Sequence, residues 1–217
     1  RQRQMCIRDR NDVGAMSLTK LGSGVALLGY YMYHGGSNPN GRLSTLQESR
    51  ATGYSNDLPE INYDFNAPIR QYGTISDNYR EIRLLAYFLQ DFGADLAVMS
   101  ADIDPDFVKP GDTHTLRVSV RHDDIHGYVF VNNYQRRLTM DDHKDVVLKV
   151  KTKGEPVCFP KTDIASGEYA FYPYNMKLKN AVLVSALATP LCKLSCKDED
   201  VYVFYGDKDP QLSLIHI

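Results

Sequence analysis

One stretch of the chain combines hydroxyl, imidazole and glycine residues in an order that suits a ligand site. Residues 31–38 read YMYHGGSN, so two tyrosines precede His34 and a pair of glycines. A tyrosine ring can stack on the face of a sugar while its hydroxyl forms a hydrogen bond. The glycines superficially resemble the turn of an oxyanion hole, but no Gly-x-Ser-x-Gly motif supplies the serine of a hydrolase. We therefore interpret the glycines as a tight exit from a strand, and His34 as a hydrogen-bonded structural histidine.

Carboxylates are the second group of residues that could do chemistry. They occur in a long segment, residues 34–76, that has no periodic element; such loops are usually either functional or disordered, and interleaved apolar residues argue against disorder. The acidic residues in question are Glu48, Asp57, Glu60 and Asp64. Hydrolysis of a glycoside needs two carboxyl groups facing across the bond, about 5–5.5 Å apart in retaining enzymes. Spacing alone selects no such pair, so solvated or turn-capping roles are expected for each.

The sequence predicts no cofactor and no metal site. It has no phosphate-cradling glycine loop, no Cys-x-x-Cys pair and no histidine at the spacing of zinc ligands. The four cysteines are Cys6, Cys158, Cys192 and Cys196. The last two are separated by three residues, which is only a weak metal signal. We expect all four to be reduced structural thiols.

Composition and charge narrow the class of protein. Of the 217 residues, 43% are hydrophobic and 24% are charged, which is ordinary for a soluble globular protein. The net charge of -2 and the absence of a long basic cluster argue against nucleic acid and against an anionic membrane surface as partners. No apolar stretch reaches the roughly 20 residues that span a bilayer. The chain has 15 tyrosines and no tryptophan, which suits sugar stacking and a β-sandwich core equally.

The tyrosines and His34 end an apolar run that predicts a buried strand. Residues 25–33 are apolar without alternation, which is typical of a strand covered on both faces in a parallel sheet. Substrates bind at the carboxyl ends of such strands, so the polar tip of the run, with its tyrosines and His34, would lie where a substrate binds. Such a strand needs a parallel neighbour on each side, and the rest of the chain supplies neither.

Two helices are predicted on either side of this run. The first would be capped by Asn11 or Asp12 and would be stopped by Gly22 and Gly24. The second would be capped by Ser76 or the next residue, carry apolar side chains at helical spacing, and end at Gly93.

The second half of the chain has the pattern of an all-β domain. Apolar and polar residues alternate in several short runs, with turns at roughly 8–12-residue spacing, which is typical of an antiparallel sandwich or jelly roll. In residues 116–121, for example, the alternation places Arg121 on the polar face. The predicted strands lie at 116–121, 128–132, 146–150, 168–174, 179–185 and 201–205.

Both ends of the chain resemble translated sequencing-adapter read-through. We therefore expect residues 1–10 and 212–217 to be non-native and leave them out of the predicted fold. The expected domains are residues 11–95 and residues 96–211. No localisation is assigned, because a signal peptide cannot be sought at such an N-terminus.

Two motifs together resemble glycoside hydrolase family 35, the β-galactosidases. YMYHGGSN at residues 31–38 is similar to the run at the last strand of that family's catalytic barrel. YDFNAPI at residues 63–69 is similar to a motif in the long loop that follows. The resemblance implies an α/β part, the last strand and flanking helices of a (β/α)8 barrel, followed by an all-β domain. Ser37 and Pro39 depart from the family's usual threonine and phenylalanine.

The resemblance also implies a function and a set of site residues. Tyr31, Tyr63 and Phe65 match positions that line the galactose site, although Phe65 lacks the hydroxyl that many members have there. The partner would be a galactose-terminated oligosaccharide or galactoside, hydrolysed with retention. Both catalytic glutamates would lie upstream in the missing N-terminal part of the barrel, so the chain would contain no catalytic residue and would be inactive alone. The alternative is a non-catalytic carbohydrate-binding or structural β-module.

Overall fold

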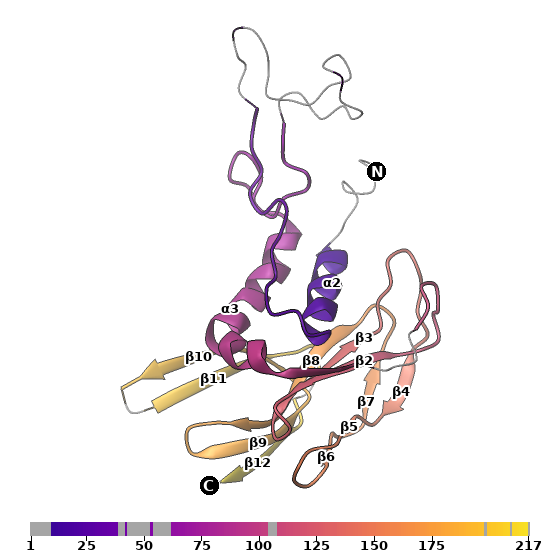
Figure 1. Ribbon diagram of the computed structural model, residues 1–217, viewed down its shortest axis with the longest axis vertical. Helices are drawn as coiled ribbons and strands as arrows, with labels where there is room; N and C mark the ends of the chain where they lie inside the picture. The colour runs from indigo at the N-terminus through magenta and orange to yellow at the C-terminus, as the bar shows by residue number, and fades with distance from the viewer. Residues whose placement is uncertain are drawn as a thin grey trace. The chain divides into compact units, whose positions relative to one another are not determined.

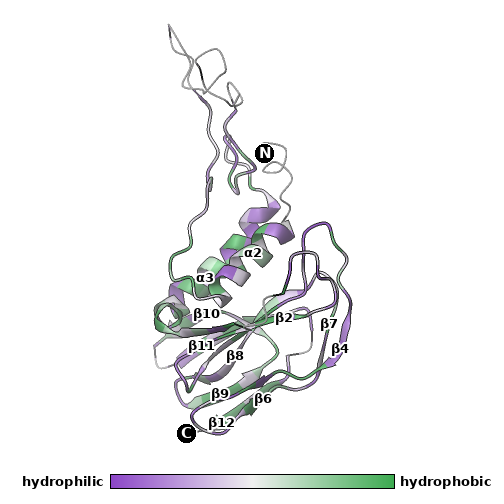
Figure 2. Ribbon diagram, turned by 45° about the vertical axis from the view of Figure 1, so that its right-hand side comes forward, coloured by the Kyte–Doolittle hydropathy of each residue, from purple (hydrophilic) through white to green (hydrophobic). Residues whose placement is uncertain are grey.

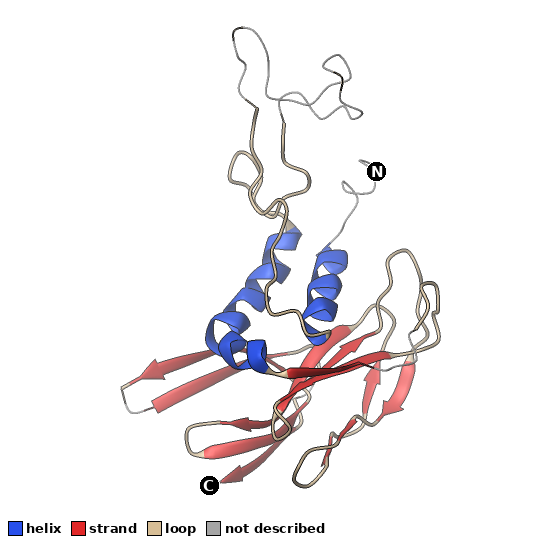
Figure 3. Ribbon diagram, in the orientation of Figure 1, coloured by secondary structure: helices blue, strands red, loops and turns tan. Residues whose placement is uncertain are grey.

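The computed structural model describes residues 10–38, 42, 53, 62–103, 108–197, 199–208 and 210–216. These residues form an α+β fold with two helices, an antiparallel six-stranded sheet and three two-stranded sheets (Figures 1 and 3). Contacts divide the chain into two compact units, the first with the described residues of 10–13 and 29–83, the second with those of 14–28 and 84–216. The expectation of helices together with a β-rich half is therefore confirmed. The described residues form no (β/α)8 barrel.

The first helix is confirmed close to its predicted ends. Helix α2 spans Arg10–Gly22. Beyond it, Ser23 N–H donates to the carbonyl of Thr19 at 2.9 Å, and Gly24 has a φ of +97°. Glycine adopts this left-handed conformation without steric cost, which is why the helix stops here.

The second helix begins where predicted but runs further. Helix α3 spans Asp77–Val98, and the Ser76 carbonyl accepts the N–H of Tyr79 at 3.1 Å. The prediction that Gly93 ends the helix is wrong. An internal glycine costs about 1 kcal/mol relative to alanine, and burial of Leu96, 2% exposed, outweighs that cost by continuing the apolar stripe.

The predicted buried strand at residues 25–33 is wrong. The described backbone forms no strand there, and the Leu27 and Tyr31 side chains are 90% and 75% exposed. A strand covered on both faces requires neighbours to satisfy its N–H and C=O groups. The described part of the chain has no strand paired with residues 25–33, so this requirement is not met.

The strand predictions for the second half hold at most positions. The six-stranded sheet has the order β1-β2-β3-β8-β9-β12. The turn predicted at residues 122–127 joins β2 to β3 as an antiparallel hairpin. Strands β1, β4, β6, β7, β10 and β12 were not predicted, apart from the last residue of β4. The single strand predicted at residues 146–150 is interrupted, because β4 ends at Val146 and β5 contains only Lys149–Val150. Strand β12 lies within residues 212–217, which were expected to be non-native. The sheet contains β1 Ser100–Ile103, β2 Arg117–His122, β3 Gly127–Asn132, β8 Tyr169–Lys177, β9 Ala181–Ala186 and β12 Leu212–His216; the small sheets contain β10 Thr189–Cys196 with β11 Glu199–Tyr205, β4 His143–Val146 with β7 Thr162–Ile164, and β5 Lys149–Val150 with β6 Val157–Cys158.

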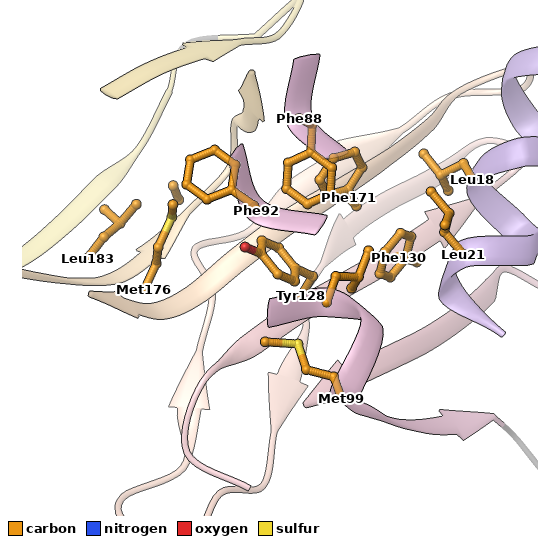
Figure 4. Close-up of a cluster of buried hydrophobic side chains, with 12 residues drawn as sticks. Leu18, Leu21, Phe88, Phe92, Met99, Tyr128, Phe130, Phe171, Met176 and Leu183 are labelled. Atoms are coloured by element: carbon orange, nitrogen blue, oxygen red, sulfur yellow. The ribbon is translucent and has the colours of Figure 1, made fainter. Parts of the chain in front are cut away.

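The centre of the sheet is buried on both faces, because the side chains of β3 alternate between two cores. In β3, Tyr128 and Phe130 join the cluster that contains residues of α2 and α3, whereas Val129 and Val131 join the cluster that contains residues of β5, β6 and β7. Figure 4 shows the helix-side cluster, in which the Phe88 ring lies beside that of Phe171, and Leu18 and Leu21 come from α2.

Aromatic rings make up much of the helix-side cluster. The centroid of Phe88 lies 4.6 Å from that of Phe171 and 5.3 Å from that of Tyr128, and Phe130 stacks on Phe171 at 5.2 Å. Each such pair contributes about 0.5–1.5 kcal/mol beyond area burial. Figure 2 shows hydrophobic and hydrophilic residues interspersed along both helices, as expected of elements with one buried face.

Arg121 of β2 joins the C-terminal ends of both helices to the sheet. Its side chain is 1% exposed, although the alternation in sequence put it on the polar face of its strand. The guanidinium donates to the carbonyls of Leu21 at 2.7 Å, Leu96 at 2.5 Å and Met99 at 2.9 and 3.2 Å. Burial lowers the pKa of Arg121, but an arginine starts so far above neutral pH that it stays charged. Helix C-termini carry partial negative charge, so they suit a buried cation.

Replacement of Arg121 by methionine is expected to lower the free energy of unfolding by on the order of 3 kcal/mol. Three carbonyl oxygens would lose charge-assisted donors, while the apolar volume is largely kept. Urea unfolding followed by circular dichroism measures the change. Arg137, which is exposed, is the control, and Arg137→Met is expected to change stability by less than about 0.5 kcal/mol. Equal effects of the two substitutions would contradict this role of Arg121.

Candidate functional site

The two sequence motifs lie side by side because their backbones are hydrogen-bonded. Gly35 N–H donates to the carbonyl of Ile69 at 2.7 Å, and Ile69 N–H donates to the carbonyl of Tyr33 at 3.0 Å. These two bonds enclose an isolated parallel bridge between His34 and Ile69. Residues 33–35 of the first motif therefore pair with Ile69, the last residue of the second.

A second set of bonds joins the beginning of the later motif to the end of the earlier one. Tyr63 N–H donates to the carbonyl of Gly36 at 2.7 Å, next to an antiparallel bridge between Ser37 and Asn62. The backbone of Tyr63 is thus held directly against the residues that follow His34.

Asp64 connects three segments of this unit. Its Oδ1 accepts the N–H of Gln71 at 2.6 Å, and its own N–H donates to Oδ1 of Asn62 at 3.0 Å. A Cβ on Gly35 would lie 1.8 Å from Asp64 Oδ1, so any larger residue there would force the Asp64 carboxylate to move. The neighbouring Gly36 has open space around it. The turn-stabilising role expected for Asp64 agrees with these bonds.

A tight turn positions Phe65. Ala67 N–H donates to the carbonyl of Asp64 at 2.7 Å, and the two central residues have positive φ, +45° at Phe65 and +62° at Asn66. Positive φ at both central positions is typical of a type I′ turn, and it is uncommon for a bulky aromatic residue. The Arg70 side chain, which lies beyond the turn in sequence, donates to Oδ1 of Asn66 at 2.7 Å and so stabilises the turn.

All three predicted site residues come together. The hydroxyls of Tyr31 and Tyr63 are 3.1 Å apart and form a hydrogen bond, across 32 positions of sequence. The Phe65 ring meets the Tyr63 ring edge to face, with centroids 4.5 Å apart and an interplanar angle of 83°. The peptide bond between Tyr31 and Met32 is cis. Tyr31 is the most exposed of the three.

This arrangement can bind a ligand that has both an apolar face and hydroxyl groups. A phenol hydroxyl has one donor and two acceptor positions. Whichever tyrosine donates to the other, the exposed Tyr31 hydroxyl keeps capacity for a ligand. The adjacent rings of Tyr63 and Phe65 supply apolar contact area.

The other sequence candidates contribute less. Nδ1 of His34 lies 2.5 Å from the carbonyl of Gly35, as expected for a hydrogen-bonded histidine. Glu48, Asp57 and Glu60 lie outside the described residues. No group of three or more metal-ligating side chains occurs in the described ranges. Cys6 is outside those ranges, and the other cysteines are free thiols, exposed at Cys158 and Cys196 and half-buried at Cys192.

Sequence reasoning missed Gln71, which is bonded through its backbone to Asp64 and through its side chain to Ser37. Ser37 Oγ donates to Oε1 of Gln71 at 2.9 Å. The glycine two residues later is the sequence feature that could have indicated a turn here. Gly73 has a φ of +81°, a conformation that glycine supplies in turns.

No family model matches this chain, and no curated protein matches it either. None of the described helices is long and apolar enough to cross a membrane.

Replacement of Gly35 by alanine is expected to displace the Asp64 carboxylate and to free the N–H of Gln71. Loss of a charge-assisted hydrogen bond corresponds to roughly a tenfold or greater increase in amide exchange. Hydrogen exchange measured by NMR tests this at Gln71, with the amides of β3 as the internal reference for folding. Gly36→Ala is the matched control, because nothing lies within 4 Å of the added Cβ. If both variants leave Gln71 exchange unchanged, the proposed constraint at Gly35 does not exist.

Proposed function

We propose that this chain is the C-terminal part of a retaining β-galactosidase of the glycoside hydrolase family 35 type. In this proposal it supplies one wall of the site for a terminal, non-reducing β-D-galactosyl residue. The observation that carries the proposal is the 3.1 Å hydrogen bond between Tyr31 and Tyr63. Each tyrosine comes from one of the two motifs on which the resemblance rests, and nothing in their sequence spacing requires the two hydroxyls to meet.

The chemistry of the cluster suits a pyranose. A sugar ring has an apolar C–H face and equatorial or axial hydroxyls, so it needs an aromatic contact and a hydrogen-bonding group side by side. Phe65 and Tyr63 provide the rings, and Tyr31 provides an exposed hydroxyl. The choice of galactose among sugars comes from the resemblance and not from the cluster itself.

The proposal assigns no catalytic residue to the described part of the chain. Asp64 is the described carboxylate nearest in sequence to the tyrosines, and its Oδ1 is already bonded to the backbone of Gln71. The acid/base and nucleophilic glutamates would belong to earlier strands of the barrel. The β-rich unit would be the domain that follows the barrel, with sandwich or jelly-roll architecture.

One observation favours the alternative, a non-catalytic carbohydrate-binding or structural module. The six-stranded sheet has a buried cluster on each face, so the second unit has the cores that an independent module needs. The two candidates differ in where a sugar binds: in the first at Tyr31 and Tyr63, in the second on the β-rich unit.

The purified chain is expected not to hydrolyse an aryl β-galactoside. Without the nucleophile and the acid/base there is no route to the covalent intermediate. Release of the chromogenic phenol is the measurement. Turnover that is abolished by changing one of the chain's own carboxylates, such as Asp64→Asn, would overturn the assignment.

The chain is expected to bind methyl β-galactoside weakly, and Tyr31→Phe and Tyr63→Phe are each expected to lower the affinity roughly two- to tenfold. The reason is the loss of one hydroxyl from a bonded pair. NMR chemical-shift titration gives both the affinity and the location of binding. Tyr87→Phe, an exposed tyrosine on α3, is the control and should have no effect. Shifts confined to the β-rich unit would support the alternative function instead.

A further inference from the structure

Exposed tyrosines concentrate around the two motifs. Of the five exposed tyrosines among the described residues, Tyr31, Tyr33 and Tyr72 fall in the first unit. Tyr72 is the most exposed, at 82%. The function proposed above uses Tyr31 but gives Tyr72 no role.

Tyr72 lies at the tip of a hydrogen-bonded turn. Arg70 N–H donates to the carbonyl of Thr74, and Gly73 N–H donates to the carbonyl of Arg70, both at 2.8 Å. An antiparallel bridge between Ile69 and Ile75 closes the base of the turn. The backbone that carries the Tyr72 ring is therefore well constrained.

The same turn is bonded to both motifs. Gln71, which precedes Tyr72, receives the Ser37 hydroxyl at its side-chain oxygen and donates its N–H to Asp64. Asp64 in turn follows Tyr63. The bond lengths along this path, with the 2.6 Å hydrogen bond, limit the Cα atoms of Tyr63 and Tyr72 to at most about 16 Å apart, which a short oligosaccharide can span.

A constrained backbone with an exposed aromatic ring is suited to binding. Tyrosine offers a large, rigid contact surface with few torsions to immobilise, and a pre-organised backbone lowers the entropic cost of association. A single exposed aromatic residue is otherwise unremarkable on a protein surface; here its attachment to the predicted site distinguishes it.

We infer that Tyr72 is a specificity-determining residue that contacts the second sugar of the ligand, the one joined to the terminal galactose. This contact would make the chain bind a galactosyl disaccharide more tightly than a simple galactoside. Asp64 acts as a positioning residue, because it holds the turn through Gln71. This inference rests on the proposed function.

The test compares two ligands on the full 217-residue chain. Methyl β-galactoside and a β-galactosyl disaccharide are titrated separately, and NMR shifts give each affinity. The disaccharide is expected to bind roughly two- to tenfold tighter, as one added aromatic contact allows. Tyr72→Ala is expected to bring the ratio of the two affinities to about one, whereas Tyr72→Phe keeps the ratio because it keeps the ring. Tyr87→Ala is the control for loss of an exposed tyrosine elsewhere.

The outcomes separate this inference from the proposed function. If the galactoside binds at Tyr31 and Tyr63 but the disaccharide gains nothing, or if Tyr72→Ala weakens both ligands equally, the role of Tyr72 is overturned and the proposed function stands. If neither sugar binds, both are overturned. If the disaccharide binds, is insensitive to Tyr31→Phe and Tyr63→Phe, and loses affinity in Tyr72→Ala, Tyr72 is a sugar-binding residue and the galactose assignment fails.

Discussion

The buried guanidinium of Arg121 is the interaction on which the arrangement of the second unit depends. A buried charge is costly, and here the compensation comes from main-chain carbonyls at Leu21, Leu96 and Met99. These carbonyls lie at the ends of two helices that are far apart in sequence. One side chain of β2 therefore brings the ends of both helices to the same part of the sheet, and the aromatic cluster fills the space between helices and sheet.

Alternation predicted β2, β3, β11 and part of β5, because period-2 patterns depend only on which face of a strand is buried. It missed the shorter strands β4, β6 and β7, which contain too few residues to show a period. It did not predict the burial of Arg121, since a polar residue on a polar face looks solvated unless its helix partners are known. The apolar run at residues 25–33 failed for the opposite reason. Its composition specifies burial, but a strand also requires neighbours, and these are not encoded within the run. The helix continues through Gly93 because packing of the buried residues beyond it outweighs the low helix propensity of glycine.

The residues of the candidate site came from motif resemblance, and the structure brings Tyr31, Tyr63 and Phe65 together as a group. The framework around them was less predictable. Asp64 holds Gln71 by a bond to a backbone N–H, and every residue except proline has that donor, so side-chain types do not reveal the partner. Gly35 is similar: the sequence suggested conformational freedom, whereas the structure shows that the missing Cβ makes room for a carboxylate.

Strand β12 is the last strand of the six-stranded sheet, and this position has a consequence for behaviour in solution. Its Leu212, Leu214 and Ile215 side chains are 49–61% exposed, and residues 212–216 contain no lysine, glutamate or proline. Charged residues and proline are what natural edge strands use to prevent pairing with other molecules. Association between copies should therefore begin at this edge at high concentration. Removal of β12 would not prevent association, because β9 would become the new edge strand and its Leu183 belongs to the core.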